Sequence, residues 1–369
     1  MSEELPQCLR QFYDGRKEQT YPSKDLPQPP PWLNPQLFTR GQKFAQDHFY
    51  ALAYSDIVSL IALFSLKDSL GPLIFTGNSS CVFSSFKRYV STALRVLSWY
   101  EGDVFDPNST AGKNILRVRN MHRLVIERLK ATESDVLAER TNIVRPLESL
   151  ASVVRQDMNL VQGVDDEGHS VGTLPLNQWH SGITQFMFIG MVVTNPEKLG
   201  IVFYTEEDLE ALVHLWAVLG YMIGIKDEYN LCIDGLSSFR ERGIALRKAC
   251  ILPSLKNVDG QWEHMSRCMA QGTGLYMPSV TFEGLLLYLF FVLDLPIVNL
   301  WNVIGWKHKI LFSVSKFFLT IAIYTPGFRS LYNTITRKGL SVAEKAEPNW
   351  MVQVREKASL YHENFEYMK

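Results

Sequence analysis

The amino-acid sequence predicts an all-α protein that is built as a single large helical domain. Apolar residues recur at helical spacing through most of the 369 residues, and the alternation typical of strands is almost absent. Hydrophobic residues make up 46% of the chain and no Gly/Ser linker separates the apolar segments. The chain can therefore build one large core.

The first helices follow from local signals. A Pro-rich arm, residues 1–35, ends at Asn34-Pro35, where a capping residue and a proline at the first helical position open a long helix over 36–66. The stretches GPLIFTGN, EGDVFDPNST and KATES are typical of turns, and they separate further helices that we predict over 80–100, 111–131 and 134–161.

The middle of the chain continues this pattern. A polar loop, VDDEGHSVGT, precedes the segment PLNQ and another apolar helix. Thr205-Glu-Glu-Asp208 resembles a capping box, and the helix that it starts is apolar on nearly every face. We expect that helix to be buried at the centre of the domain.

The last third contains the two most hydrophobic stretches, FEGLLLYLFFVLDLPIVNLW and KILFSVSKFFLTIAIY. The first is long enough to cross a bilayer, but Glu283, Asp294 and Pro296 interrupt it. A buried helical hairpin, a hairpin at a membrane surface over residues 282–324, and a double span all stay open. We divide the chain into the arm, a domain over 36–275 and a hydrophobic hairpin with a C-terminal helix over 276–369, packed on the same domain.

Composition excludes several classes of function. The 37 basic residues balance 38 acidic ones and form no basic stripe, which excludes electrostatic binding of nucleic acid. The five cysteines form no Cys-x-x-Cys pair, so neither a zinc site nor a disulfide framework is indicated. The first twenty residues are too polar for a signal peptide. We expect a cytoplasmic protein, or one at the cytoplasmic face of an intracellular membrane such as the endoplasmic reticulum.

The candidate site is centred on the segment Arg119-Asn-Met-His122 of a predicted helix. Arg88 and Thr92 share a face of the preceding helix, because positions three or four apart are neighbours on a helix. One imidazole, guanidinium groups and a hydroxyl can form a metal-centred pocket. Buried arginines need an anionic partner. That partner is either a cofactor or a structural ion pair with one of three acids: Glu101, Asp106 or Glu127.

These residues carry a family resemblance. The chain resembles the superfamily of latex-clearing proteins (rubber oxygenases) and endoplasmic-reticulum-bound oxygenases of the mycophenolic-acid pathway, over roughly residues 40–250. The resemblance rests on Arg88-x-x-x-Thr92, on Arg119-x-x-His122, on PLNQ (Pro175–Gln178) with Thr184-Gln185-Phe186, and on the segment His214–Ile225. It implies a helical fold around a buried pocket for heme b.

The resemblance also implies a role for each matching residue. His122 matches the ligand of the heme iron, and Arg119 matches the arginine beside it. Arg88 and Thr92 match the distal residues that hold dioxygen and substrate, with Arg88 also beside the cofactor. Two positions depart from the family: Ser91 replaces a distal lysine and Pro72 replaces a glutamate proposed as the base. Asp68 lies one helical turn from Pro72, on a different register.

The expected function is therefore a heme-dependent oxygenase that uses dioxygen to cleave, or to insert oxygen into, a hydrophobic alkene-containing substrate of isoprenoid type. The alternative is a catalytically degenerate protein that binds heme or a hydrophobic ligand at a membrane surface, and Pro72 and Ser91 favour it. His180 is interpreted as a cap or surface residue, with a distal or supporting role as the alternative. His214 is interpreted as a buried, hydrogen-bonded core histidine.

Overall fold

The structure is a computed structural model that describes residues 5–20, 22–166, 168–169, 176–345 and 351–359. The regular structure of these residues is helical, apart from one isolated bridge between Gln19 and Asn177. The prediction of an all-α protein is therefore confirmed. Buried residues from Leu5 to Val354 join into one hydrophobic cluster, so helices from both ends of the chain share a core.

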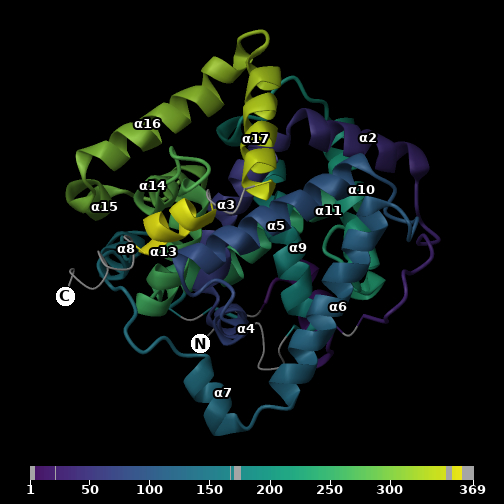
Figure 1. Ribbon diagram of the computed structural model, residues 1–369, viewed down its shortest axis with the longest axis horizontal. Coiled ribbons are helices and arrows are strands. Elements are labelled where there is room, and N and C mark those ends of the chain that lie inside the picture. The colour runs from purple at the N-terminus through teal and green to yellow at the C-terminus, as the bar shows by residue number, and fades with distance from the viewer. Residues whose placement is uncertain (1–4, 21, 167, 170–175, 346–350, 360–369) are drawn as a thin grey trace.

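The helices of the first half are arranged around α5, which passes through the middle of the molecule in Figure 1. Their bounds are α1 Gln7–Asp14, η1 Gly15–Lys17, α2 Pro35–Asp47, α3 Phe49–Ser65, α4 Lys67–Thr76, α5 Val82–Glu101, α6 Thr110–Lys130, α7 Ser134–Arg140 and α8 Ala151–Met158. The second half pairs with them: α9 packs on α3, α10 on α2, and α13 on α5.

The bounds in the second half are α9 Gln178–Thr194, η2 Pro196–Leu199, α10 Glu206–Ile223, η3 Asp227–Tyr229, α11 Gly235–Leu246, the π-helical turn η4 Arg247–Ile251, α12 Leu252–Lys256, α13 Gly260–Gly274, α14 Phe282–Val292, α15 Val298–Val303, α16 Trp306–Thr320, η5 Ala322–Tyr324 and α17 Phe328–Glu344. The two predicted N-caps are confirmed. The Asn34 side chain accepts hydrogen bonds from the amides of Gln36 and Leu37, and Thr205 and Asp208 cap each other reciprocally.

The predicted long helix over 36–66 is wrong as one element, because it breaks at His48 into α2 and α3, which are bent by 83°. The His48 ring lies between two backbone carbonyls, those of Phe44 and Val202, each 3.1 Å from a ring nitrogen. A side chain that bonds to the last turn of α2 and to a distant loop fixes the corner between the two helices. This tertiary contact is not visible in a periodic pattern.

Two further boundaries differ from the prediction. The stretch that we expected to be a turn, GPLIFTGN, forms most of α4, which contains Pro72 and ends at Gly77 with φ +68°. The predicted helix over 134–161 is two short helices, α7 and α8, with Pro146 between them. Proline cannot donate a hydrogen bond and restricts the preceding residue, so the helix ends before it.

The two hydrophobic stretches near the C-terminus have different environments. α14 is buried along nearly all of its length, whereas only Phe312 and Leu319 of α16 are buried. Of the alternatives left open by the sequence, a buried hairpin therefore describes the first helix but not the second. Within the described residues no single helix meets the length and hydropathy required to cross a membrane; the bent pair α2 and α3 meets them only when taken together.

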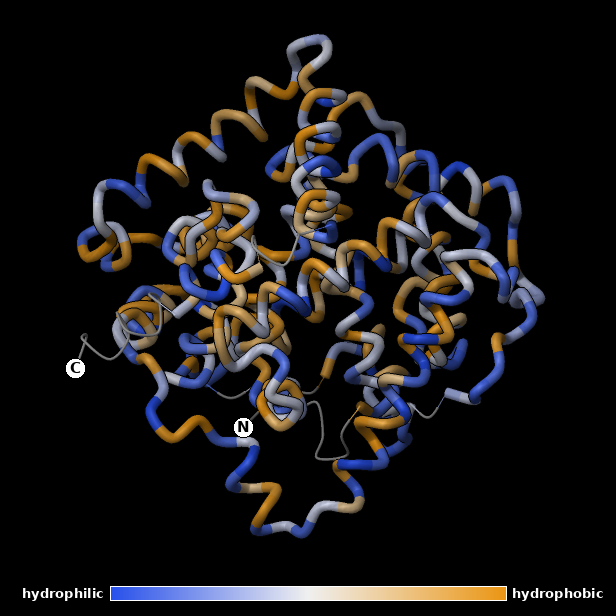
Figure 2. Tube along the Cα trace, viewed as in Figure 1, coloured by the Kyte–Doolittle hydropathy of each residue, from blue (hydrophilic) through white to orange (hydrophobic). Residues whose placement is uncertain are grey.

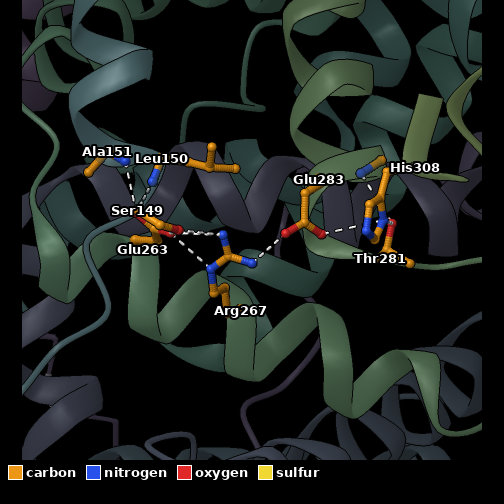
Figure 3. A network of polar contacts seen from close by, with 9 residues as sticks. Ser149, Leu150, Ala151, Glu263, Arg267, Thr281, Glu283 and His308 are labelled. Carbon is orange, nitrogen blue, oxygen red and sulfur yellow. Dashed lines mark hydrogen bonds and ion pairs between the residues drawn. The ribbon is translucent and has the colours of Figure 1, made fainter. Parts of the chain in front are cut away.

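A buried polar network connects α8, α13, α14 and α16 (Figure 3). The carboxylate of Glu263 accepts hydrogen bonds from Ser149 Oγ at 2.6 Å, from the amides of Leu150 and Ala151 at 2.7 and 2.8 Å, and from Arg267 Nε at 2.9 Å. Arg267 also pairs with Glu283, whose other oxygen lies 3.5 Å from Nδ1 of His308. The network fixes the start of α16 to the core.

Candidate functional site

The candidate site lies where α5 and α6 pack against each other. Ser109 caps the start of α6 by accepting a hydrogen bond from the amide of Gly112 at 2.9 Å. Across the interface, Asn114 Nδ2 donates to Ser98 Oγ of α5 at 2.9 Å. The pairing brings Arg88 close enough to His122 for its charge to lower the pKa of the imidazole. The structure therefore brings together the two helices that the sequence selected.

His122 is half-buried, and burial is the main cause that lowers its pKa to about 4, followed by the charges of Arg88 and Arg119. The imidazole is therefore neutral at physiological pH. Neither ring nitrogen has a hydrogen-bond partner among the described residues. A neutral imidazole with a free lone pair is the form that binds a metal ion.

Arg88 has no carboxylate partner in the described part of the chain. Its Nη1 donates to Ser79 Oγ at 2.8 Å, and that serine is buried. The structural ion pair that the sequence left open is wrong, because the three candidate acids have other partners: Glu101 pairs with Arg337, Glu127 with Arg123, and Asp106 accepts from the amide of Asn108. The guanidinium of Arg88 therefore keeps its positive charge uncompensated beside His122.

Two other side chains of α5 have unused hydrogen-bonding groups. Thr92 is half-buried, and its hydroxyl has no partner among the described residues. Arg95, one turn further on, has a buried Nε without a partner, and burial lowers the pKa of its guanidinium. One face of α5 thus offers two arginines and a hydroxyl that the protein leaves available.

Arg119 makes a different set of contacts. Its Nη1 donates to the carbonyl of Met222 at 2.8 Å, and its Nη2 and Nε donate to Ser23 Oγ and the Ser23 carbonyl at 2.8 and 3.3 Å. A cation at the carboxyl end of α10 satisfies a terminal carbonyl and opposes the helix dipole. Its predicted contact with a cofactor stays a prediction, although its charge still acts on His122.

His180 is the residue that sequence reasoning misplaced. It is only 6% exposed, not a surface residue, and lies in the first turn of α9, where its amide donates to Asn177 Oδ1 at 2.7 Å. Burial and, to a smaller extent, the nearby His122 lower its pKa to about 4. Two neutral imidazoles from α6 and α9 therefore share one site. The sequence signal that could have located His180 was Asn177, because this N-cap residue fixes the first turn of α9.

The two departures from the family pattern also have places in the structure. Pro72 lies inside α4, and Ser91 is half-buried on α5. Asp68, in the first turn of α4, raises the pKa of His180 by its negative charge. Asp68, on the same helix as Pro72, therefore lies close enough to His180 for its charge to act on it. The sequence places Asp68 four residues before Pro72, but it does not show that Asp68 lies near His180 of α9.

The remaining elements of the sequence pattern support the walls of the site. His214 is half-buried, and its Nε2 accepts a hydrogen bond from the amide of Asn34 at 3.1 Å, so the predicted hydrogen bond is confirmed but not the burial. Gln185 donates to the Trp216 carbonyl at 2.6 Å and links α9 to α10. Pro175 of PLNQ lies outside the described residues.

These residues fit a heme group. No set of three or more His, Cys, Asp or Glu side chains in the described ranges could hold a metal ion. A porphyrin supplies four nitrogen ligands itself, so one protein imidazole is sufficient. His122 provides that imidazole with its nitrogens free. Arg88 and Arg95 provide guanidinium groups that have no carboxylate partner in the part of the chain that the structure describes, and such groups suit the propionates of a heme.

Comparison with known proteins supports the fold. No family model matches the chain, and no curated protein matches its sequence. Among solved structures, the chain is similar to the latex clearing protein LCP in its closed state, with a TM-score of 0.55 and 13% sequence identity over 92% of this chain and 80% of that one. At this identity the similarity establishes a shared all-α fold.

Proposed function

We propose that this protein is a heme b-dependent oxygenase that acts on a hydrophobic, alkene-containing substrate of isoprenoid type. The observation that carries the proposal is His122: a neutral imidazole with no hydrogen-bond partner among the described residues, beside a guanidinium without a carboxylate. The fold similarity to a protein whose name refers to latex supports the substrate class.

The residues would act in distinct ways. His122 would hold the heme iron through one ring nitrogen, and Arg88 or Arg95 would pair with a propionate. When bound, heme b supplies an iron that binds dioxygen and carries out the redox chemistry. The low pKa of His122 keeps protons from competing for the ligating nitrogen down to mildly acidic pH.

On α5, Thr92 and Arg88 are the groups that can donate to an oxygen atom of the reactants. Arg88 has further N–H groups besides the one that bonds to Ser79, and the Thr92 hydroxyl has no partner within the described ranges. Donors that are fixed before the reaction stabilise negative charge as it develops. Beside the site, Asp68 is close enough to His180 for its negative charge to act on that imidazole.

Heme binding tests the ligand assignment. Reconstitution of the full chain with hemin is expected to give a Soret band, and His122→Ala is expected to abolish it. The matched control is His214→Ala, which removes a half-buried imidazole bonded to Asn34 and leaves the band unchanged. If His122→Ala retains heme as the natural protein does, then the iron ligand lies elsewhere.

The second candidate function is a non-catalytic protein that binds heme or a hydrophobic ligand. The observation in its favour is Pro72, because α4 has no carboxylate at that position. Incubation of the heme-loaded protein with isoprenoid alkenes under dioxygen separates the two, since an oxygenase forms new carbonyl or oxygenated products. We expect Arg88→Met to lower product formation by about a hundredfold. Heme retention without any product would favour the binding protein.

A further inference from the structure

The C-terminal helices α15, α16, η5 and α17, which we call the platform, expose apolar side chains in an unusual pattern. α16 forms one edge of the molecule in Figure 1. Its solvent face is a continuous apolar stripe at helical spacing, with Trp306 67%, Phe317 50% and Ile321 60% exposed, and Ile310 and Val314 between them. A surface helix normally turns this face toward the core. Here the apolar face points outward.

The charges of the platform are basic up to its last residue, Glu344, which ends α17. Residues 295–343 contain six Lys or Arg side chains and no Asp or Glu, in a chain whose net charge is −1. Arg337 is paired with Glu101, but no carboxylate pairs with Lys307, Lys309 or Lys316 in the described part of the chain. With 3.6 residues per turn, Lys307 lies on one side of the apolar stripe and the other two lysines lie on the opposite side.

The aromatic residues of the platform lie beside these lysines. Lys309 Nζ lies 5.1 Å from the ring centre of Trp301, and Lys307 Nζ lies 5.8 Å from that of Trp306. Figure 2 shows orange and blue stretches alternating along α16. Tryptophan and lysine side chains, each with an apolar body and a polar end, are the residues that prefer the boundary between water and lipid.

The platform is fixed to the core and therefore does not need to fold on binding. His308 Nδ1 lies 3.1 Å from Thr281 Oγ1 and also contacts Glu283, at the end of the buried network in Figure 3. The buried Asp157 accepts hydrogen bonds from the amides of Asn299 and Leu300 at 2.7 and 2.9 Å, which holds the start of α15. The starts of α15 and α16 are thus anchored by two carboxylates, the buried Asp157 and the half-buried Glu283.

We infer that the platform docks the protein on the surface of an anionic lipid bilayer, with α16 lying in the plane of the interface and its apolar stripe inserted among the acyl chains. Apolar insertion flanked by lysines is the mode of interfacial helices, and the lysines add attraction to acidic headgroups. A second copy of this chain is a poor occupant, because a symmetric contact would bring two basic platforms together. This inference is independent of the heme assignment, since the platform shares no residue with the site.

The test is co-sedimentation of the full chain with vesicles of phosphatidylcholine alone or with added phosphatidylserine. We expect binding to the anionic vesicles that weakens as salt is raised. Lys307→Gln with Lys316→Gln is expected to weaken it about thirtyfold, from about 1 kcal/mol per basic residue. Ile310→Ser with Phe317→Ser is expected to abolish it. The matched control is Ile244→Ser, which removes an even more exposed apolar side chain (68%, against 51% for Ile310 and 50% for Phe317) from α11 and leaves binding unchanged.

A second measurement uses the natural protein and does not depend on how a variant folds. Lipids with brominated acyl chains are expected to quench tryptophan emission, because Trp306 is exposed on the stripe whereas Trp179, Trp216 and Trp262 are fully buried. Three results would overturn the inference: no quenching and no sedimentation with anionic vesicles, equal binding of platform and control variants, or a dimer in solution that Phe317→Ser dissociates.

Discussion

Substitution of Glu263 by Gln tests the buried network in Figure 3 most directly. Glu263 is fully buried, and its two oxygens accept from four donors: Ser149 Oγ, the amides of Leu150 and Ala151, and Arg267 Nε. In the Gln variant, the side-chain NH2 group replaces one acceptor oxygen and faces other hydrogen-bond donors. The substitution also removes the negative charge beside Arg267. Loss of one partner of a buried ion pair typically costs 3–5 kcal/mol.

The lower end of that range applies here, because Arg267 keeps its second carboxylate, Glu283. We therefore expect a loss of about 3 kcal/mol in the free energy of unfolding. At about 2.1 cal/mol/K of unfolding entropy per residue, a chain of 369 residues loses about 4 °C in Tm. Thermal unfolding followed by circular dichroism measures the shift.

The matched control is Glu206→Gln, which also removes a carboxylate from the first turn of a helix and from an arginine, Arg240, but at an exposed position. Exposed pairs contribute about 0–1 kcal/mol, so Tm should fall by about 1 °C at most. The double variant Glu263→Gln with Arg267→Met should lose less free energy of unfolding than the two single variants lose together. Equal shifts for Glu263→Gln and Glu206→Gln would refute the reasoning.

Three further predictions concern other parts of the core. Burial raises the pKa of Asp56 well above its usual range, so the folded protein binds this proton more tightly than the unfolded chain does. The folded protein therefore loses stability as pH rises above about 4. Asp56→Asn should raise Tm more at pH 8 than at pH 5, and a gain in Tm that does not depend on pH would contradict this. Gly41→Ala should destabilise by about 2 kcal/mol in urea unfolding, because a Cβ there would lie 2.2 Å from the Ala211 carbonyl oxygen. Gly339→Ala, where the nearest atom beyond the chain neighbours is 3.8 Å away, should stabilise α17 by about 1 kcal/mol; the same sign for both would exclude the close contact as the cause. Arg119→Met should cost about 2 kcal/mol, measured in the same way, because the carboxyl end of α10 loses its charged donor; an unchanged midpoint would show that this contact contributes nothing.

Part of the site could be predicted from the sequence because it depends on helical spacing. Arg119 and His122 are three residues apart and share a face of α6, as do Arg88 and Thr92 on α5. The partners of these residues could not be predicted. From the sequence alone, Glu101 or Glu127 could have neutralised Arg88. In the structure Glu101 pairs with Arg337 and Glu127 pairs with Arg123 instead.

For the platform, too, the sequence predicted one property and the fold decided another. Hydropathy identified both C-terminal stretches as apolar, but it could not show that α14 is enclosed by α3, α13 and α16 while α16 keeps an open face. Burial depends on which elements lie around a helix, and this is a property of the whole fold.

The sequence by itself determined that this protein is helical and where several helices begin, because caps, prolines and apolar periodicity act within one or two turns. Only the tertiary structure decided that His180 lies near His122, that Arg88 lacks a carboxylate partner within the described ranges, and that the apolar stripe of α16 faces outward. These features depend on the packing of segments that are tens of residues apart. Local energies leave such packing open, and the burial of one shared core fixes it.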